Sequence, residues 1–178
     1  MPTVLVLLAE GFEEVEALAP VDLLRRAGAE VTTAALAEGI HVTGRSGITL
    51  HADAPLSAVS GPFDCLVLPG GAGTKGLRAD PRVAERVRRQ QAEGGWIAAI
   101  CAAPTVLQDA GLLAGRRYTA HFSVANELPA ILADERVVAD GRLLTSRGAG
   151  TALDFGFLLI EKLFSPEKAG EIRRSIGA

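Results

Sequence analysis

The sequence predicts an α/β protein built on an open, mostly parallel sheet with helices on both faces. One observation behind this prediction is that short aliphatic runs alternate with longer helical patterns along the chain. The other is composition, because hydrophobic residues make up 48 % of the chain and aromatic residues only 4 %. Strands buried on both faces of a parallel sheet need such aliphatic runs. We expect residues 1–178 to form one domain, since 178 residues suffice for a full core.

Each expected element is bounded by a turn or capping signal. The expected strands are Thr3–Leu8, Glu30–Leu36, Asp64–Leu68 and Trp96–Ile100. The expected helices are Glu13–Ala27, one that begins with Pro81 after an Asp80 cap, Ala102–Ala110, about Thr151–Leu163, and a last short one capped by Ser165. Small hairpins are expected around Gly44–Gly47 and Asp140–Gly141.

Charge and cysteine content exclude several classes of function. The net charge is −3 and the basic residues are scattered, whereas nucleic-acid binding needs a basic patch. The apolar run at the N-terminus has no basic segment and is far shorter than the roughly 20 residues that span a membrane. We therefore expect a cytoplasmic protein without a membrane contact. Cys65 and Cys101 lie in separate strand signals and predict no disulfide, and three dispersed histidines predict no metal site.

Three loops are candidates for a functional site because ligands of open α/β folds bind beyond the carboxyl ends of the strands. These loops are Glu10–Glu16 after the first strand, Pro69–Gly76 after the third, and Cys101–Pro104 after the fourth.

Cys101 is the strongest candidate for chemistry because it follows the strand Trp96–Ile100 directly. Two alanines come next, before a helix with Pro104 in its first turn. A residue on so tight a turn projects its side chain from the edge of the sheet, as the serine of a nucleophile elbow does. A helix N-terminus also favours an anion, so we expect a lowered thiol pKa. The alternative is a small buried hydrophobic residue, which is our interpretation of Cys65.

The glycines of Pro69–Gly76 match a dinucleotide-binding pattern, but their context does not. We expect the next helix to begin only at about Asp80, so that no helix N-terminus abuts the glycines. The strand that follows ends at Cys101 without an acidic residue for a ribose, and no Gly-Lys-Ser/Thr closes the loop as in a P-loop. The two consecutive glycines suit instead a close backbone approach, with an N–H donor for an oxyanion beside Cys101.

Glutamates and a histidine are candidate proton-transfer groups. Glu16 has apolar neighbours at helical spacing, and a carboxyl on an apolar face has a raised pKa. Glu13 has apolar neighbours too, so spacing alone does not choose between them, and glutamates in a first turn also offset the helix dipole. His121 is the only histidine in the second half of the chain, where a lone histidine is more often structural than catalytic.

Five stretches together make the sequence resemble the ThiJ/PfpI superfamily, specifically the clade of the parkinsonism-associated protein deglycase (DJ-one) and bacterial relatives such as YajL. These stretches are Gly11–Glu16, Pro20–Gly28, Asp64–Gly71, Ala98–Pro104 and Leu144–Thr151, and they cover nearly the whole chain in order. The resemblance implies a flavodoxin-like fold and a homodimer.

The resemblance also implies roles for individual residues. Cys101 falls on the reactive cysteine, Glu16 on a protonated glutamate that hydrogen-bonds it, and His121 on a histidine that some members place nearby. Gly71 and Ala102 fall on the residues whose backbone N–H groups face the site.

The chain departs from the family pattern at several positions. Ala103 stands where the family often has glycine, and Phe122 stands where proline commonly follows the histidine. Ser46 aligns with an arginine that lines a dimer-related pocket in the nearest relatives, although Arg45 is adjacent. Arg26 matches the companion of that arginine and is the candidate for the pocket.

The predicted function is that of a cofactor-independent glyoxalase or protein deglycase. The Cys101 thiolate would attack a small 2-oxoaldehyde such as methylglyoxal, free or on a glycated amine, to form a hemithioacetal. Gly71 and Ala102 would hold the oxyanion, while Glu16 and His121 would move the proton. The alternative is an oxidative-stress sensor or redox-regulated chaperone that uses oxidation of the same cysteine. Proteolysis is disfavoured because no histidine follows the nucleophile, and a class I glutamine amidotransferase because no His-x-Glu lies downstream.

Overall fold

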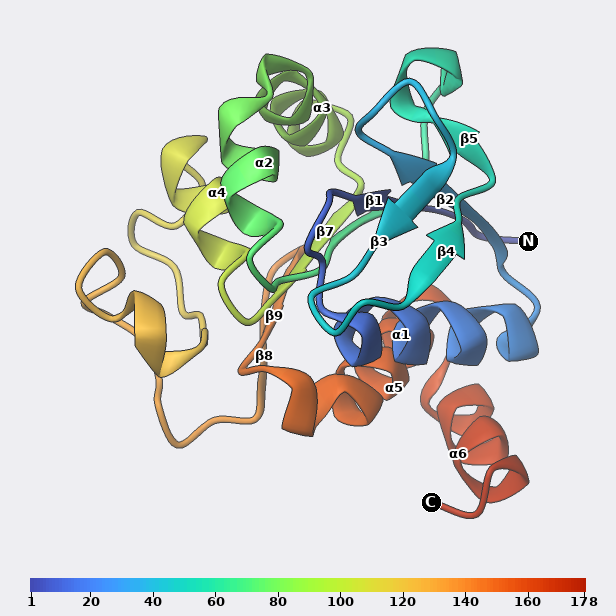
Figure 1. Ribbon diagram of the computed structural model, residues 1–178. Coiled ribbons are helices and arrows are strands. Elements are labelled where there is room, and N and C mark those ends of the chain that lie inside the picture. Colours follow the sequence, from blue (N-terminus) through green and yellow to red (C-terminus); the bar gives the residue numbers. More distant parts are fainter.

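The computed structural model describes all 178 residues and shows a seven-stranded sheet between two layers of helices, with a separate two-stranded hairpin (Figure 1). Its strands are β1 (Thr3–Leu8), β2 (Glu30–Ala35), β3 (His41–Thr43), β4 (Thr49–His51), β5 (Ala54–Pro55), β6 (Cys65–Leu68), β7 (Trp96–Ile100), β8 (Val137–Asp140) and β9 (Leu143–Ser146). Its α-helices are α1 (Glu14–Ala27), α2 (Thr74–Ala79), α3 (Pro81–Ala92), α4 (Pro104–Asp109), α5 (Ala152–Leu163) and α6 (Pro166–Ser175).

The sheet has seven strands in the order β5-β2-β1-β6-β7-β9-β8, and β3 and β4 form a separate hairpin. All neighbours in the large sheet are parallel except β8, which pairs antiparallel with β9. The strand order changes direction between β1 and β6. The loops that leave these two strands therefore open a crevice at the carboxyl edge of the sheet, where ligands of such folds bind.

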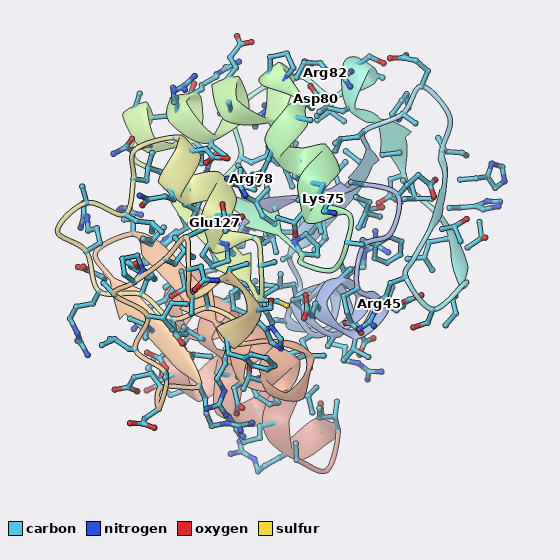
Figure 2. All side chains as sticks on the ribbon, turned by 60° about the vertical axis from the view of Figure 1, so that its left-hand side comes forward. Arg45, Lys75, Arg78, Asp80, Arg82 and Glu127 are labelled. Atoms are coloured by element: carbon cyan, nitrogen blue, oxygen red, sulfur yellow. The ribbon has the colours of Figure 1, made fainter.

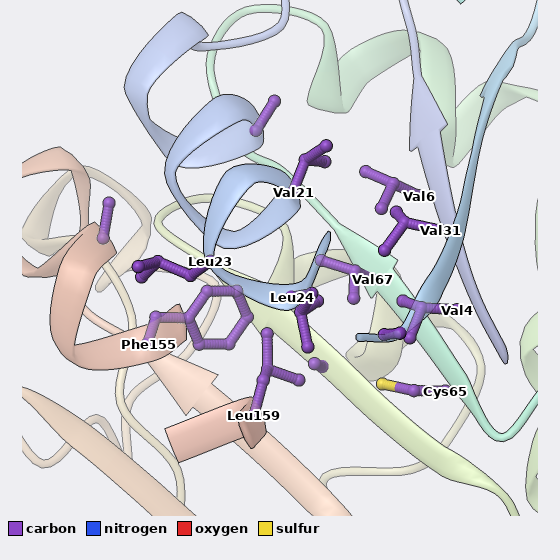
Figure 3. Packing of buried hydrophobic residues seen from close by; sticks show 14 of the residues in the cluster. Val4, Val6, Val21, Leu23, Leu24, Val31, Cys65, Val67, Phe155 and Leu159 are labelled. Atoms are coloured by element: carbon purple, nitrogen blue, oxygen red, sulfur yellow. The ribbon is translucent and has the colours of Figure 1, made fainter. Parts of the chain in front are cut away.

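Alternate residues of the central strands enter two separate cores, which explains their continuous aliphatic sequences. Val4, Val6 and Leu8 of β1 pack with α1 and α5, in the core shown in Figure 3. Leu5 and Leu7 point to the other face, where α2, α3 and α4 cover the sheet. Figure 1 shows α1, α5 and α6 together on the first face and α2, α3 and α4 on the second.

The structure confirms the predicted fold class, including the hairpin at Asp140–Gly141 and the helix that Asp80 caps. The expectation that no helix begins before Asp80 is wrong. Gly73 precedes the short helix α2, which starts at Thr74. Its six residues include Gly76, a poor helix former, and this composition hides the helix from sequence patterns.

Candidate functional site

Cys101 occupies the tight turn between β7 and α4. It is the only residue other than glycine with a positive φ, at 66°. Such a conformation costs on the order of 1–3 kcal/mol and persists only where its surroundings enforce it. Two backbone hydrogen bonds do so here, because the Cys101 N–H donates to Ser146 O at 2.9 Å and the Cys101 carbonyl accepts from the His121 N–H at 2.9 Å. The side chain is half-buried.

Glu16 lies in the first turn of α1 and is only 1 % exposed. Its Oε2 accepts a hydrogen bond from the Gly70 N–H at 2.9 Å. Glu13 is the N-cap of α1, because its carboxylate accepts a hydrogen bond from the Glu16 N–H at 2.8 Å. The geometry thus separates two glutamates that sequence spacing leaves equivalent.

Gly70 and Gly71 bring the loop after β6 into close contact with both groups. A Cβ on Gly70 would lie 2.6 Å from the Cβ of Cys101 and 2.6 Å from Oε2 of Glu16, so no side chain fits between them. Gly71 has φ +86°, and a Cβ there would meet the Glu13 backbone N at 2.6 Å. The Glu13 N–H donates to the Gly70 carbonyl at 3.0 Å, which ties α1 to this loop.

The Glu16 carboxyl and the Cys101 thiol interact directly and titrate as a pair. Burial raises the pKa of Glu16 to about 7. Burial, together with the charge of the Glu16 carboxylate, raises the pKa of Cys101 to about 12. Because each titration depends on the charge of the other group, both pKa values belong to the pair. Between pH values of about 7 and about 12 the pair therefore carries one negative charge and one proton.

Backbone N–H groups face both members of this pair. Those of Gly71 and Ala102 lower the pKa of Cys101, and that of Gly70 lowers the pKa of Glu16. The single negative charge is therefore supported by hydrogen-bond donors on the sulfur as well as on the carboxylate.

The prediction of a lowered thiol pKa is wrong, because burial of the sulfur and then the charge of Glu16 raise the pKa of Cys101 to about 12. Helix α4 begins only at Pro104, and burial beside a carboxylate outweighs the helix dipole. When the proton resides on Glu16, the repulsion disappears and the carboxyl can donate to the sulfur. Protonation of Glu16 would therefore favour a thiolate at Cys101, although burial of the sulfur still raises its pKa.

His121 adjoins the pair through its backbone and through one edge of its ring. Its Nδ1 lies 2.9 Å from Ser123 Oγ and accepts from the Ser123 N–H at 3.3 Å, so the neutral ring carries its proton on Nε2. On the other side, a Cβ on Gly148 would lie 3.3 Å from Cδ2 of His121 and 3.9 Å from Oε1 of Glu16. His121 and Glu16 therefore approach the same point at Gly148.

An ion-pair network holds the loop that carries His121. Arg78 on α2 binds Asp109 through two hydrogen bonds of 2.6 and 2.9 Å, and it binds Glu127 at 2.7 Å. Figure 2 shows Arg78 directed toward Glu127 from the neighbouring helix. The contact with Asp109 is bidentate and the contact with Glu127 is a single bond, so Arg78 links the segment after His121 to α2 and α4.

Arg26 lies outside this arrangement. It pairs with Asp22 on the exposed face of α1 at 2.7 Å and makes no hydrogen bond to the Cys101 site within the chain. Ser46 is the position that aligns with the family arginine. Its backbone N–H donates a hydrogen bond to Oε1 of Glu14 at 2.7 Å.

The structure confirms the close backbone approach predicted for the two consecutive glycines, whereas no role was predicted for Gly148. The signal for Gly70 is its place in Pro69-Gly-Gly directly after a buried strand, whereas nothing local marks Gly148. A surface cavity of about 580 Å³ lies away from this site, near Thr3 and Trp96 at the opposite edge of the sheet. No cluster of three or more potential metal ligands is present, and no helix has the length and apolarity to cross a membrane.

The fold and the site together define a class of protein, an open α/β domain with a cysteine on a strained turn beside a buried carboxyl. The chain belongs to the DJ-1/PfpI family, whose model matches residues 2–162. It is 41 % identical over 177 residues to Protein dj-1beta of Drosophila melanogaster, covering 97 % of this chain and 95 % of that protein. It is 34 % identical over 171 residues to the Glutathione-independent glyoxalase DJR-1.2 of Caenorhabditis elegans, covering 94 % and 91 %.

Solved structures agree with this assignment. The crystal structure of Drosophila melanogaster DJ-1beta superposes with a TM-score of 0.95 at 40 % identity, covering 98 % of this chain and 97 % of that one. The oxidized DJ-1 of Toxoplasma gondii superposes with a TM-score of 0.94 at 35 % identity, covering 99 % and 98 %.

Proposed function

We propose that the protein is a glyoxalase that needs neither glutathione nor a metal and converts 2-oxoaldehydes such as methylglyoxal to 2-hydroxy acids. The observation that carries the proposal is the pair formed by Cys101, on its strained turn, and the buried carboxyl of Glu16. The name of the Caenorhabditis elegans relative supports the same chemistry. A deglycase activity, in which the aldehyde is already attached to an amine, would use the same residues.

The first step is addition of Cys101 to the aldehyde carbon. A C–S bond forms, the carbonyl π bond breaks, and the new oxyanion takes a proton to give a hemithioacetal. The N–H groups of Gly71 and Ala102, which already lower the pKa of the thiol, are the candidate donors to that oxyanion. Glu16 would supply the proton, since its pKa of about 7 suits a group that both gives and takes protons.

The second step is an internal redox reaction. A base removes the hydrogen on the former aldehyde carbon as a proton, and the ketone oxygen takes a proton to give an enediol. The neighbouring carbon then gains a proton while the hydroxyl of the former aldehyde carbon loses one, which gives a thioester of the 2-hydroxy acid. One carbon is oxidised and the other reduced, so no external oxidant is needed. Water then cleaves the thioester and regenerates the thiol. His121 and Glu16, which both lie near Gly148, are the proposed proton carriers.

The test is conversion of methylglyoxal to lactate by the purified protein without glutathione and with a chelator present. We expect turnover that the chelator leaves unchanged. A rate equal to the background in solution would overturn the proposal, and loss of activity on chelation would overturn its metal-free mechanism.

A second candidate function is a peroxide sensor or redox-regulated chaperone that uses oxidation of Cys101. Its supporting observations are the partial exposure of this thiol and the oxidized state named for the Toxoplasma gondii structure. Oxidation to a sulfinic acid adds two oxygen atoms, which peroxide supplies. Peptide mass spectrometry after peroxide treatment tests it, with a gain of about 32 Da on the peptide that holds Cys101 and none on the peptide that holds Cys65 as the expected result.

A further inference from the structure

Phe122 is a large aromatic residue that the fold leaves in solvent beside the candidate site. Its side chain is 80 % exposed and belongs to neither core. Its ring lies against the imidazole of His121, with the centroids 4.1 Å apart and the planes inclined by 36°. The ring therefore has one face on the histidine and the other open.

The backbone fixes where this ring stands. The His121 N–H donates to the carbonyl of Cys101 at 2.9 Å. Phe122 is the next residue in the chain, so its backbone lies close to the nucleophile. The Nδ1 side of the imidazole is held by Ser123, and its Cδ2 side faces Gly148 and Glu16. Phe122 is thus stacked on a histidine whose backbone contacts Cys101 and whose ring lies near Gly148, as Glu16 does.

We propose that Phe122 determines specificity by forming an aromatic wall at the rim of the site, which favours 2-oxoaldehydes that carry an aromatic group on the ketone carbon. This inference rests on the proposed glyoxalase function and names its substrate class. An aryl group that projects from the Cys101 adduct past His121 would meet the open face of Phe122, whereas the methyl group of methylglyoxal is too short to do so. Aromatic pairs of this kind favour offset or tilted stacking.

The chemistry is unchanged for the larger substrate. Phenylglyoxal adds to the thiol through its aldehyde carbon, that carbon is oxidised while the ketone carbon is reduced, and water releases mandelate. Only the contact of the aryl ring with Phe122 is new. Loss of that contact should therefore change the ratio of kcat/KM for phenylglyoxal to kcat/KM for methylglyoxal.

The first test compares kcat/KM for phenylglyoxal with kcat/KM for methylglyoxal in wild type, Phe122→Ala and Phe122→Tyr. We expect Phe122→Ala to lower the ratio about three- to tenfold, the range of a typical aromatic contact, and Phe122→Tyr to keep it. Ile40→Ala, which removes an exposed apolar side chain from the segment before β3, serves as the matched control and should leave the ratio unchanged. If Phe122 only supported His121, both substrates would slow equally and the ratio would stay constant, which would overturn the inference.

The second test separates this inference from the proposed function because it needs no turnover. Cys101 is alkylated with phenacyl bromide or with bromoacetone, in which the sulfur displaces bromide as the C–S bond forms and the C–Br bond breaks. The quantity compared is the ratio of the alkylation rate with phenacyl bromide to the rate with bromoacetone. We expect this ratio to be about three- to tenfold higher in wild type than in Phe122→Ala. An equal preference in both proteins would overturn the role of Phe122 even if the glyoxalase activity is found. A retained preference without turnover of either aldehyde would instead contradict the proposed function alone.

Discussion

The two cysteines stand on neighbouring strands of the same sheet, yet their surroundings differ completely. Cys65 begins β6 and is fully buried among aliphatic side chains, where Figure 3 shows it beside Val4. Cys101 comes after the end of β7, is half-buried, and has φ +66°. Burial raises the pKa of Cys65 well above its ordinary value, and no backbone donor offsets this effect. Cys101, in contrast, has two N–H donors and a proton partner.

The comparison shows that position along a parallel strand decides what a thiol can do. At the amino end of a central strand the surroundings are aliphatic, and a cysteine there serves as a small apolar residue. One residue beyond the carboxyl end, the chain must turn, and the turn brings backbone N–H groups and neighbouring loops within reach of the sulfur. The chemical difference comes from the sheet edge and not from the residue type.

The largest expected effect separates the two cysteines by turnover. Cys101→Ser replaces the nucleophile and should lower methylglyoxal turnover at least about 10³-fold. Cys65→Ser keeps the nucleophile and should retain turnover, although a hydroxyl in an aliphatic core lowers the free energy of unfolding by about 1–3 kcal/mol. Steady-state kinetics and urea unfolding measure both. Equal loss of activity in the two variants would break the comparison.

Selective alkylation sharpens the same contrast. Limiting iodoacetamide at pH 8 should label Cys101 at least about 100-fold faster than Cys65, because Cys65 is 0 % exposed and reacts only after opening of the core. Peptide mass spectrometry of the native protein measures the two rates. Cys101→Ser provides the control, since its native state should stay unlabelled. Comparable labelling of both thiols would contradict the assignment of Cys101 as the accessible one.

A methyl group on Gly70 tests the close approach that brings Glu16 to Cys101. Gly70→Ala should lower the free energy of unfolding by about 1–3 kcal/mol, because the new Cβ would lie 2.6 Å from both side chains and 2.9 Å from the Ile100 carbonyl. Gly39→Ala is the matched control, since a Cβ there meets nothing within 4 Å. Denaturant unfolding of the two variants measures the difference. A Gly70→Ala protein as stable as Gly39→Ala would show that the site is not tightly packed.

The raised pKa of Glu16 predicts a stability change with pH. In the unfolded chain Glu16 ionises near 4.5, whereas in the folded protein it ionises at about 7. Stability from this group is therefore full below pH 4.5 and is lost as the pH rises toward 7. Glu16→Gln removes this titration, so it should gain up to about 3 kcal/mol over wild type at pH 8 and nothing at pH 4. A pH-independent difference in urea unfolding would contradict burial as the cause.

Most of the sheet could be predicted from the sequence because its signals are local. Trp96–Ile100 and Thr3–Leu8 appear as strands with the expected bounds, since buried parallel strands are continuous aliphatic runs. Helix α2 could not be predicted, because it has only six residues and contains Gly76.

Only those features of the site that depend on one loop at a time could be predicted from the sequence. Cys101 is marked by its strand-to-helix turn, but the choice between Glu13 and Glu16 depends on which carboxyl caps the helix and which turns inward. The thiol pKa depends on the charge of a group 85 positions earlier in the chain, so no local pattern around the cysteine contains it. Gly148 joins the site from a different strand end, which only the folded sheet brings close.

We propose that Cys101 reacts as a thiolate that forms when the proton shared by the pair lies on Glu16, because burial and the charge of an ionised Glu16 raise the pKa of the thiol to about 12. The rate of iodoacetamide reaction against pH gives the apparent thiol pKa for wild type, Glu16→Gln and Glu16→Leu. Glu16→Leu removes the donor and should raise the apparent pKa by about one to two units, the value of a hydrogen bond to a charged group. Glu16→Gln keeps a donor and should shift it less. A lower apparent pKa in Glu16→Leu would show that an ionised Glu16 repels the thiolate, and it would contradict the account.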